Sequence, residues 1–215
     1  MGSNEEVHVY DDIVLVTGFG PFGVHAVNAS NECVKLLPSL GLERELGIRL
    51  ITKEIPVDYQ YVQSNVPKFW ETYKPKLVVH VGVSGIVQVL TLEAQAFNTG
   101  YSSLDITGLQ PKNGVCVEGC SDSLQSSIDM RKICESINNS PSCDVVSCVS
   151  IDPGRFLCDF IYFTSLNIDS NRTAFIHVPK LDMLYSALQL AQALKKVIAE
   201  MLEQVRENDR KQNSI

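Results

Sequence analysis

One cysteine and one histidine in this sequence are placed where nucleophilic chemistry could occur. Cys158 follows a strand-like stretch that ends near Ile151 and lies at the start of a stretch typical of a helix. The free N–H groups and the positive dipole end of a helix start stabilise a thiolate and can bind an oxyanion. His177 lies near the end of the next strand-like stretch, where an imidazole could take the thiol proton and return one to a leaving amine. Residues at such positions often only fill a core, so spacing alone leaves both interpretations open.

A catalytic pair of this kind needs a third group to orient the imidazole. Glu93 is a candidate because it is a carboxylate within an otherwise apolar run, although spacing alone favours an edge-strand charge that faces water. The run from Gly82 to Gly85 resembles a nucleophile elbow, but Ile86 stands where that motif needs glycine, which disfavours a serine hydrolase. His80 lies inside an apolar run and is predicted to be a hydrogen-bonded core residue.

A glycine-rich turn follows the first strand-like stretch. Residues 18–23, GFGPFG, match the G-x-G-x-x-G pattern of dinucleotide-binding loops. Pro21 lacks an N–H, and Phe19 and Phe22 add bulk where that motif needs bare backbone. A tight turn, or a binding lip with two aromatic faces, fits these residues better. Asn28 is then either the cap of the next helix or a polar group aimed into the same pocket.

Strand-like and helix-like stretches alternate along the chain. We expect strands over residues 13–17, 48–55, 76–82, 89–97, 145–151 and 174–178. We expect helices over residues 28–37, 58–74 (kinked or restarted at Pro67) and 122–138, after residues 153–154 and from residue 184 onward, with a loop at 100–121. This alternation predicts a single-domain, three-layer α/β/α fold with a largely parallel central sheet. In such sheets the sites lie at the carboxyl ends of the strands, and a right-handed βαβ unit would bring Cys158 and His177 to one edge.

Composition and charge narrow the possible functions. The chain has 215 residues, a net charge of −7 and 45% hydrophobic residues, which suits a globular protein and argues against a nucleic-acid partner. No apolar run reaches the roughly 20 residues of a membrane-spanning helix. We expect one domain over residues 1–207 and a frayed polar tail over 208–215.

Cysteine usage points to a reducing compartment. The 7 cysteines are odd in number and lack C-x-x-C spacing, and the 4 histidines are scattered. Neither a disulfide framework nor a metal site is therefore expected. The first residues lack the pattern of a secretory signal, so we expect a cytoplasmic protein.

Five motifs together resemble the pyroglutamyl peptidase I (pyrrolidone-carboxylate peptidase) family, in its animal-type branch. They are TGFGPFG at 17–23 with Asn28 and Ser30, VHVGVSG at 79–85, EAQAFN at 93–98, GRFLCD at 154–159 and FIHVP at 175–179. The resemblance implies a cytosolic α/β cysteine omega-peptidase, without metal or cofactor, that removes N-terminal pyroglutamate from small peptides through an acyl-enzyme. It implies Cys158 as nucleophile, His177 as general base and acid, and Glu93 as the carboxylate that orients His177.

The resemblance also implies a pocket for the pyroglutamyl lactam. Its parts would be Phe19 and Phe22 as walls, Phe156 and Leu157 nearby, Asn28 holding the loop, and the Val83 carbonyl as acceptor of the lactam N–H. A lactam is small, flat and uncharged, so aromatic faces suit it. Its N–H and C=O would find partners that an open-chain residue leaves unsatisfied.

One departure from the family pattern keeps an alternative open. Pro153 stands before the cysteine motif where animal members have alanine, which removes an N–H and pushes Asp152 toward extended backbone. A perturbed nucleophile turn would leave a relative that binds pyroglutamyl peptides without turnover. The sequence leaves the oligomeric state and the role of the 100–121 segment open.

Overall fold

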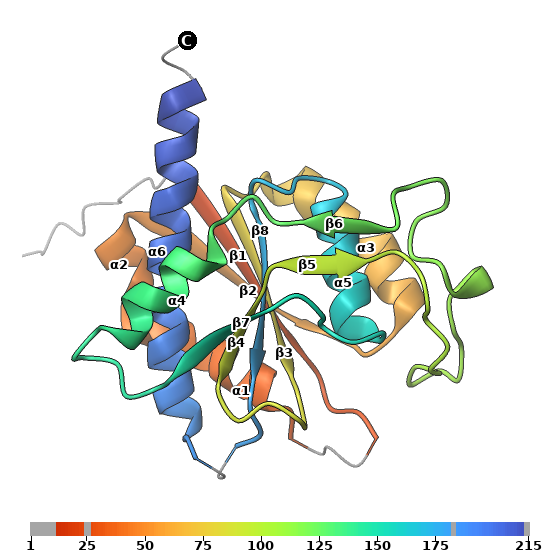
Figure 1. The fold of residues 1–215 in the computed structure, drawn as a ribbon, viewed down its shortest axis with the longest axis horizontal. Coiled ribbons are helices and arrows are strands. Elements are labelled where there is room, and N and C mark those ends of the chain that lie inside the picture. Colours follow the sequence, from red (N-terminus) through yellow and green to blue (C-terminus); the bar gives the residue numbers. More distant parts are fainter. Residues whose placement is uncertain (1–11, 24–26, 182–183, 213–215) are drawn as a thin grey trace, which may run out of the picture.

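A six-stranded sheet forms the centre of the part of the chain that the computed structural model describes, which is residues 12–23, 27–181 and 184–212 (Figure 1). Across the sheet the strands are β2 (Ile48–Ile55), β1 (Asp12–Phe19), β3 (Leu77–Val83), β8 (Thr173–Val178), β4 (Leu90–Glu93) and β7 (Ser147–Ser150). The helices are α1 (Ala29–Leu36), α2 (Leu42–Leu46), α3 (Tyr59–Tyr73), α4 (Met130–Asn138), α5 (Leu157–Leu166) and α6 (Ala187–Gln212). Short 3-10 turns lie at Leu37–Leu40 and Lys112–Gly114.

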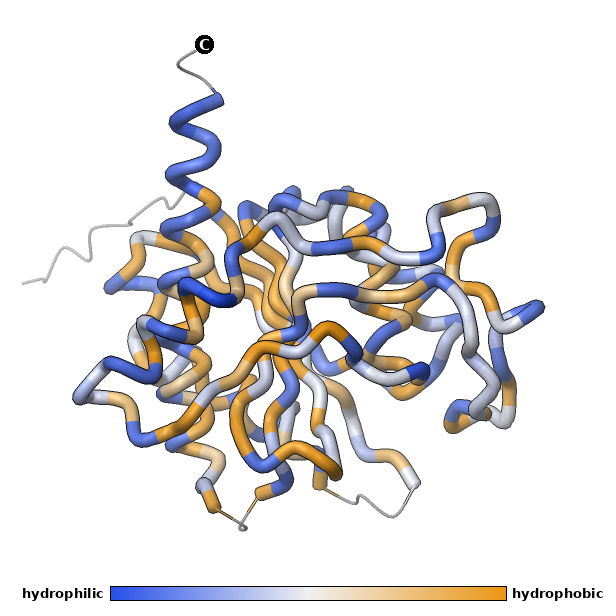
Figure 2. The backbone as a smooth tube through the Cα atoms, in the orientation of Figure 1, coloured by the Kyte–Doolittle hydropathy of each residue, from blue (hydrophilic) through white to orange (hydrophobic). Residues whose placement is uncertain are grey.

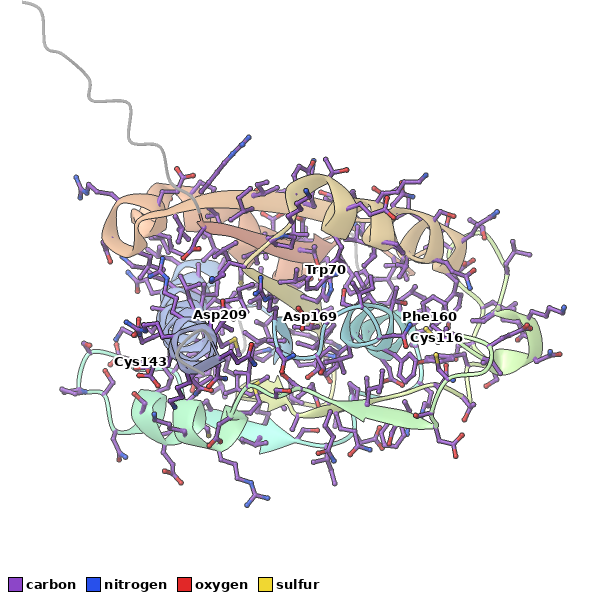
Figure 3. All side chains as sticks on the ribbon, turned by 90° about the horizontal axis from the view of Figure 1, so that it is seen from above. Trp70, Cys116, Cys143, Phe160, Asp169 and Asp209 are labelled. Carbon is purple, nitrogen blue, oxygen red and sulfur yellow. The ribbon has the colours of Figure 1, made fainter. Side chains whose placement is uncertain are left out.

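Helices cover both faces of this sheet, so the predicted three-layer α/β/α fold is confirmed. On one face α1, α4 and α6 pack into an apolar cluster with the strands, and on the other face α3 and α5 form a second cluster. The central strands are apolar along their length because both of their faces are covered, and Figure 2 shows this as orange backbone between the layers. Viewed from above, Trp70 of α3 and Phe160 of α5 lie on the same side of the sheet (Figure 3).

The sheet is largely parallel, as predicted, but the strand order corrects one expectation. β2, β1, β3 and β8 run parallel, whereas β4 is antiparallel to β8 and β7 is parallel to β4. β7 therefore runs opposite to β8 and is separated from it by β4, so β7, α5 and β8 do not form the predicted parallel βαβ unit. The reason is that β3 is followed by a short reversal at residues 84–89, which inserts β4 in the opposite direction.

Two expected elements differ from the structure. The strand predicted over residues 89–97 breaks at Ala94, whose N–H donates to the Ser150 carbonyl, and resumes as β5 (Gln95–Phe97). β5 pairs with β6 (Ser123–Gln125) in a separate two-stranded sheet. The helix predicted from residue 122 starts only at α4, where the Asp129 side chain accepts from the N–H groups of Arg131 and Lys132.

One further expectation about a helix is confirmed, and the expectation of a frayed tail is wrong for its described residues. Asp58 caps α3, and the helix continues through Pro67 without restarting. Residues 208–212, expected to be frayed, continue α6, because Asp209 pairs with Lys76 at 2.6 Å. Figure 2 shows this end of α6 as hydrophilic. The last three residues lie outside the described part. Among the described residues, no helix combines the length and apolarity needed to cross a bilayer.

Candidate active site

Cys158 lies in the first turn of α5, beside the carboxyl ends of β3 and β8. No side chain among the described residues caps this helix, so its first N–H groups are left for another acceptor. The thiol sits against Gly82 of β3, where an added Cβ would meet the Cys158 Sγ and the Phe175 ring, each at 2.8 Å. Glycine at position 82 therefore makes room for the Cys158 thiol.

His177 lies next to this thiol, because His177 of β8 pairs in register with Gly82 of β3. Its Nδ1–H donates to Glu93 Oε1 at 2.8 Å. Glu93 lies on β4, diagonally across from His177, since Thr91 is the residue directly opposite. Burial would lower the pKa of His177, but the Cys158 thiolate, its hydrogen bond and the Glu93 carboxylate together raise it to about 9. The ring is thus held in the charged form beside the sulfur.

The carboxylate of this trio is buried and anchored. Glu93 is 2% exposed, and its backbone carbonyl accepts from the Tyr162 hydroxyl of α5 at 2.8 Å. Its second carboxylate oxygen, Oε2, has no hydrogen-bond partner among the described residues. The interaction with His177 is therefore the main compensation for burying this charge.

An aromatic pocket opens beside the thiol. Its lining consists of Phe19, Phe22, Asn28, Val57, Val83, Phe156, Leu157 and Cys158. The rings of Phe22 and Phe156 lie 6.4 Å apart. Apart from the thiol, none of the described residues in this lining has an ionisable side chain. The hollow is narrow, with a volume of about 20 Å³, and the chemistry of its lining suits a small, uncharged group.

Asn28 holds the turn that carries the pocket's aromatic walls. Its Nδ2 donates to the Gly20 carbonyl at 2.9 Å, and its Oδ1 accepts from the Ser30 N–H and hydroxyl. The Ser30 hydroxyl in turn accepts from the Phe19 N–H at 3.0 Å. Asn28 is therefore the cap of α1 and the support of the turn, and it also borders the pocket.

A wider cleft of about 580 Å³ continues from the thiol in the other direction. Phe22, Val83, Phe156 and Cys158 border both the aromatic pocket and this cleft, so the two hollows meet at the sulfur. The 84–87 loop forms one wall, residues 152–155 form another, and Thr91, Glu93 and His177 lie between them. A chain bound in the aromatic pocket would extend along this cleft.

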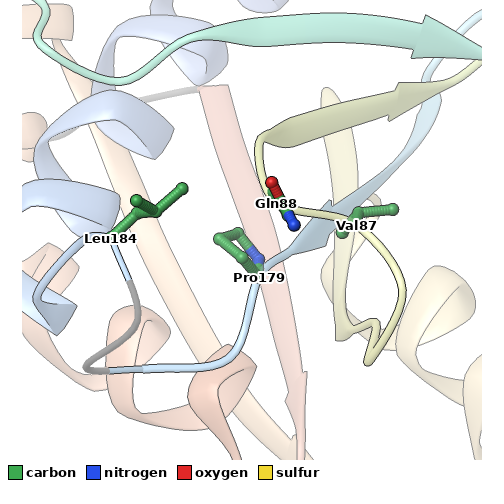
Figure 4. Close-up of a pocket in the computed structure, with 4 residues that line it drawn as sticks. All are labelled: Val87, Gln88, Pro179 and Leu184. Carbon is green, nitrogen blue, oxygen red and sulfur yellow. The ribbon is translucent and has the colours of Figure 1, made fainter.

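A separate hollow of about 170 Å³ lies beside the cleft, between the 84–89 connection and the chain after β8 (Figure 4). Its lining residues are Val87, Gln88, Pro179 and Leu184. None of these four side chains can act as an acid, base or nucleophile, so the chemistry belongs to the cleft that contains Cys158.

The structure brings together every site residue predicted from the sequence. Cys158, His177 and Glu93 are in one cluster, and all six predicted pocket residues line one cavity. His80 is a core residue as predicted, hydrogen-bonded to Thr17 and Ser165 at 2.7 Å each, and burial lowers its pKa to about 3. Sequence reasoning missed Val57, an apolar loop residue whose position in the pocket only the fold reveals.

Metal-binding chemistry receives no support from the arrangement of side chains. Within residues 12–23, 27–181 and 184–212, no three histidine, cysteine or carboxylate side chains are grouped as metal ligands. The glycine-rich turn also differs from a dinucleotide-binding loop, because its backbone groups already have partners. The Phe19 N–H donates to the Ser30 hydroxyl, the Gly20 carbonyl accepts from the Asn28 side chain, and the Phe19 ring borders the pocket.

Known proteins that resemble the chain in sequence carry the name pyroglutamyl peptidase. Residues 12–196 match the sequence model of the pyroglutamyl peptidase family. The chain is 46% identical over 200 residues to human pyroglutamyl-peptidase 1, covering 93% of this chain and 94% of the relative. It is 48% identical over 189 residues to the rat protein of the same name, covering 88% and 89%.

Solved structures share the fold. Pyrrolidone carboxyl peptidase from Thermococcus litoralis aligns with a TM-score of 0.81 at 20% identity, over 92% of this chain and 96% of that one. Pyroglutamyl peptidase I from Bacillus amyloliquefaciens aligns with a TM-score of 0.78 at 23% identity, over 90% and 98%. At this level of identity the likeness concerns the α/β architecture.

Proposed function

The chain belongs to the pyroglutamyl peptidase family of cysteine peptidases, and from this we propose that it hydrolyses the peptide bond after an N-terminal pyroglutamyl residue, with Cys158 as nucleophile. The observation that carries the proposal is a chain of side-chain contacts beside the aromatic pocket: the Cys158 thiol contacts His177, and His177 contacts Glu93. The substrates would be small peptides whose first residue enters that pocket and whose remainder lies in the cleft.

The acylation step uses the charged pair. The Cys158 thiolate attacks the carbonyl carbon of the pyroglutamyl residue, and a carbon–sulfur bond forms while the carbonyl oxygen becomes an oxyanion. The uncapped N–H groups at the start of α5 are placed to stabilise that oxyanion. His177 then donates its proton to the leaving nitrogen, the carbon–nitrogen bond breaks, and a thioester remains on Cys158.

In deacylation the direction of proton transfer is reversed. His177, now neutral, accepts a proton from water as the water oxygen attacks the thioester carbon. The carbon–sulfur bond breaks, free pyroglutamate leaves, and the Cys158 thiolate and His177 imidazolium are restored. Glu93 holds Nδ1–H of His177 throughout, so that Nε2 is the nitrogen that exchanges protons.

Specificity for the lactam would come from the aromatic pocket. The faces of Phe19 and Phe22 suit a flat ring, and a free amino group would meet no carboxylate among the described lining residues. The Val83 backbone borders the pocket and is the proposed acceptor for the lactam N–H. An open-chain residue would leave such polar partners unpaired, which is costly in a buried site.

The binding-only alternative depended on disruption by Pro153. Asp152 accepts from the Gly154 N–H at 3.1 Å, which gives the loop a local partner at the residue after the proline. Cys158, His177 and Glu93 remain in contact behind this loop, which supports turnover over binding alone. The seven free cysteines support the reducing cytoplasm as the compartment.

Turnover of a fluorogenic pyroglutamyl amide tests the proposal. We expect Cys158→Ser to abolish turnover, whereas Cys143→Ser, a matched change at a partly buried cysteine outside the cleft, should retain it. Iodoacetamide should also label Cys158 faster than the other six cysteines near neutral pH, because Cys158 lies at a helix start beside His177, the surroundings typical of reactive cysteines. A wild-type protein that is stabilised by pyroglutamyl peptides yet hydrolyses none would overturn the enzymatic proposal.

A further inference from the structure

A second buried carboxylate, Asp159, directly follows the nucleophile and takes no part in the chemistry described above. Its side chain is fully buried. Carboxylates are almost never buried completely without partners that fix them. The partners of Asp159 therefore indicate what the residue holds in place.

Both oxygens of Asp159 bond outside their own helix. Oδ1 accepts from the Phe97 N–H at 2.9 Å, and Oδ2 accepts from the Tyr101 hydroxyl at 3.0 Å. An acidic residue at the third position of a helix commonly caps the start of that same helix. Here the side chain instead joins the first turn of α5 to β5 and the segment after it.

The segment to which Asp159 is hydrogen-bonded continues the strand that carries Glu93. β4 ends at Glu93, and β5 with Phe97 follows after one residue. One turn further along α5, the Tyr162 hydroxyl donates to the Glu93 carbonyl. The helix that carries Cys158 is thus fastened at two successive turns to the chain that carries Glu93.

Arginine supplies a third partner to this junction. The Arg155 guanidinium lies 3.6 Å from Asp159 Oδ2 and 2.6 Å from Asp152, and it stacks over the Phe97 ring at 3.7 Å from its centroid. Arg155 also borders the cleft. The positive charge of Arg155 is therefore held beside Asp159. It offsets the repulsion that an ionised Asp159 would exert on a thiolate at the neighbouring Cys158.

We propose that Asp159 is a positioning residue, which fixes Cys158 relative to His177 and Glu93 by tying the first turn of α5 to Phe97 and Tyr101. The inference rests on the proposed function, because it assigns Asp159 a role in that same site. It acts through the placement of Cys158 and not through contact with the substrate.

The partners of the Asp159 carboxyl support this role. Burial raises the pKa of its carboxyl to about 7, whereas the Phe97 N–H, the Tyr101 hydroxyl and Arg155 act to lower that pKa. All three partners favour the ionised form, which accepts both hydrogen bonds. Replacement by asparagine keeps the size of the side chain but removes the carboxyl group that pairs with Arg155 and accepts from the Tyr101 hydroxyl.

Asp159→Asn and Tyr101→Phe test the inference with the full-length enzyme. We expect kcat per titrated active site to fall about tenfold or more in each variant, as for loss of a hydrogen bond to a charged group, with KM unchanged. The rate of iodoacetamide alkylation at Cys158 should fall in both variants. Tyr101→Phe keeps the test usable if Asp159→Asn does not fold.

A destabilised control separates positioning from stability alone. Asp129→Ala removes a helix-capping carboxylate at α4, outside the cleft, and should lower the melting temperature without changing kcat. A normal kcat and alkylation rate in Asp159→Asn, even with a lower melting temperature, would overturn the inference. If wild-type protein shows no turnover, the proposed function fails, yet the comparison of alkylation rates still decides whether Asp159 positions Cys158.

Discussion

Glu93→Gln is the substitution that tests the proposed triad most directly. It keeps the shape of the side chain and removes the charge that faces His177 at 2.8 Å. Both residues are buried, so solvent screens their interaction little. A hydrogen bond to a charged group contributes about 1.5–3 kcal/mol. Since each 1.36 kcal/mol changes a rate tenfold, kcat/KM should fall about 10- to 150-fold.

The same substitution should move the pH dependence in a defined direction. In the wild type the Cys158 thiolate and Glu93 raise the pKa of His177 to about 9 against the effect of burial. Above that pH the imidazole is neutral and cannot protonate the leaving amine, so kcat/KM falls. Glu93→Gln removes one of the two groups that raise the pKa, so the alkaline decline should begin at lower pH.

The measurement is a pH profile of kcat/KM with a fluorogenic pyroglutamyl amide, normalised by active-site titration. Glu135→Gln, on the exposed face of α4, serves as the matched control and should behave as wild type. An unmoved alkaline decline together with a rate loss well under tenfold would refute the assignment of Glu93 as the group that orients His177.

Two further substitutions test neighbouring parts of the fold. Gly82→Ala places a methyl group 2.8 Å from the Cys158 Sγ and the Phe175 ring, so we expect a severe loss of kcat in an enzyme whose circular-dichroism spectrum stays native; retained kcat would place the thiol elsewhere. His80 is buried with its pKa lowered to about 3, so the folded state keeps it neutral while the unfolded state protonates below about pH 6.5. Stability should therefore fall by up to about 3 kcal/mol between pH 7 and pH 4, and urea denaturation at both pH values should show a smaller fall for His80→Gln.

The positions of Cys158 at a helix start and His177 near a strand end could be predicted from local sequence, but the strand order that brings them together could not. A cysteine at a helix start and a histidine near a strand end are local signals, and both positions are confirmed. The parallel βαβ unit that was expected to join them is absent from the described sheet, because β4 lies between β7 and β8. Strand order depends on long-range pairing, which apolar runs in the sequence do not encode individually.

Other differences have the same physical origin. β5 and β6 have only three residues each, too few for a periodic pattern, and they pair across the 100–121 loop. Asp159 could be read in the sequence as an ordinary first-turn acid of a helix, which is its commonest role. Its actual partners, Phe97 and Tyr101, are about 60 residues away in sequence and become visible only in the fold.

The reversed direction of β4 explains how a carboxylate can be both buried and adjacent to the histidine. If β4 ran parallel to β8, its last residue would lie at the exposed carboxyl edge. Because β4 runs from that edge inward, Glu93 instead lies opposite Phe175, one diagonal step below His177, and is 2% exposed. A charge held there acts through a poorly screened medium and cannot exchange its partner for water. The same reversal places the 84–87 loop as a wall of the cleft, and β7 runs inward beside β4, so residues 151–156 must carry the chain from Ser150 back to Cys158.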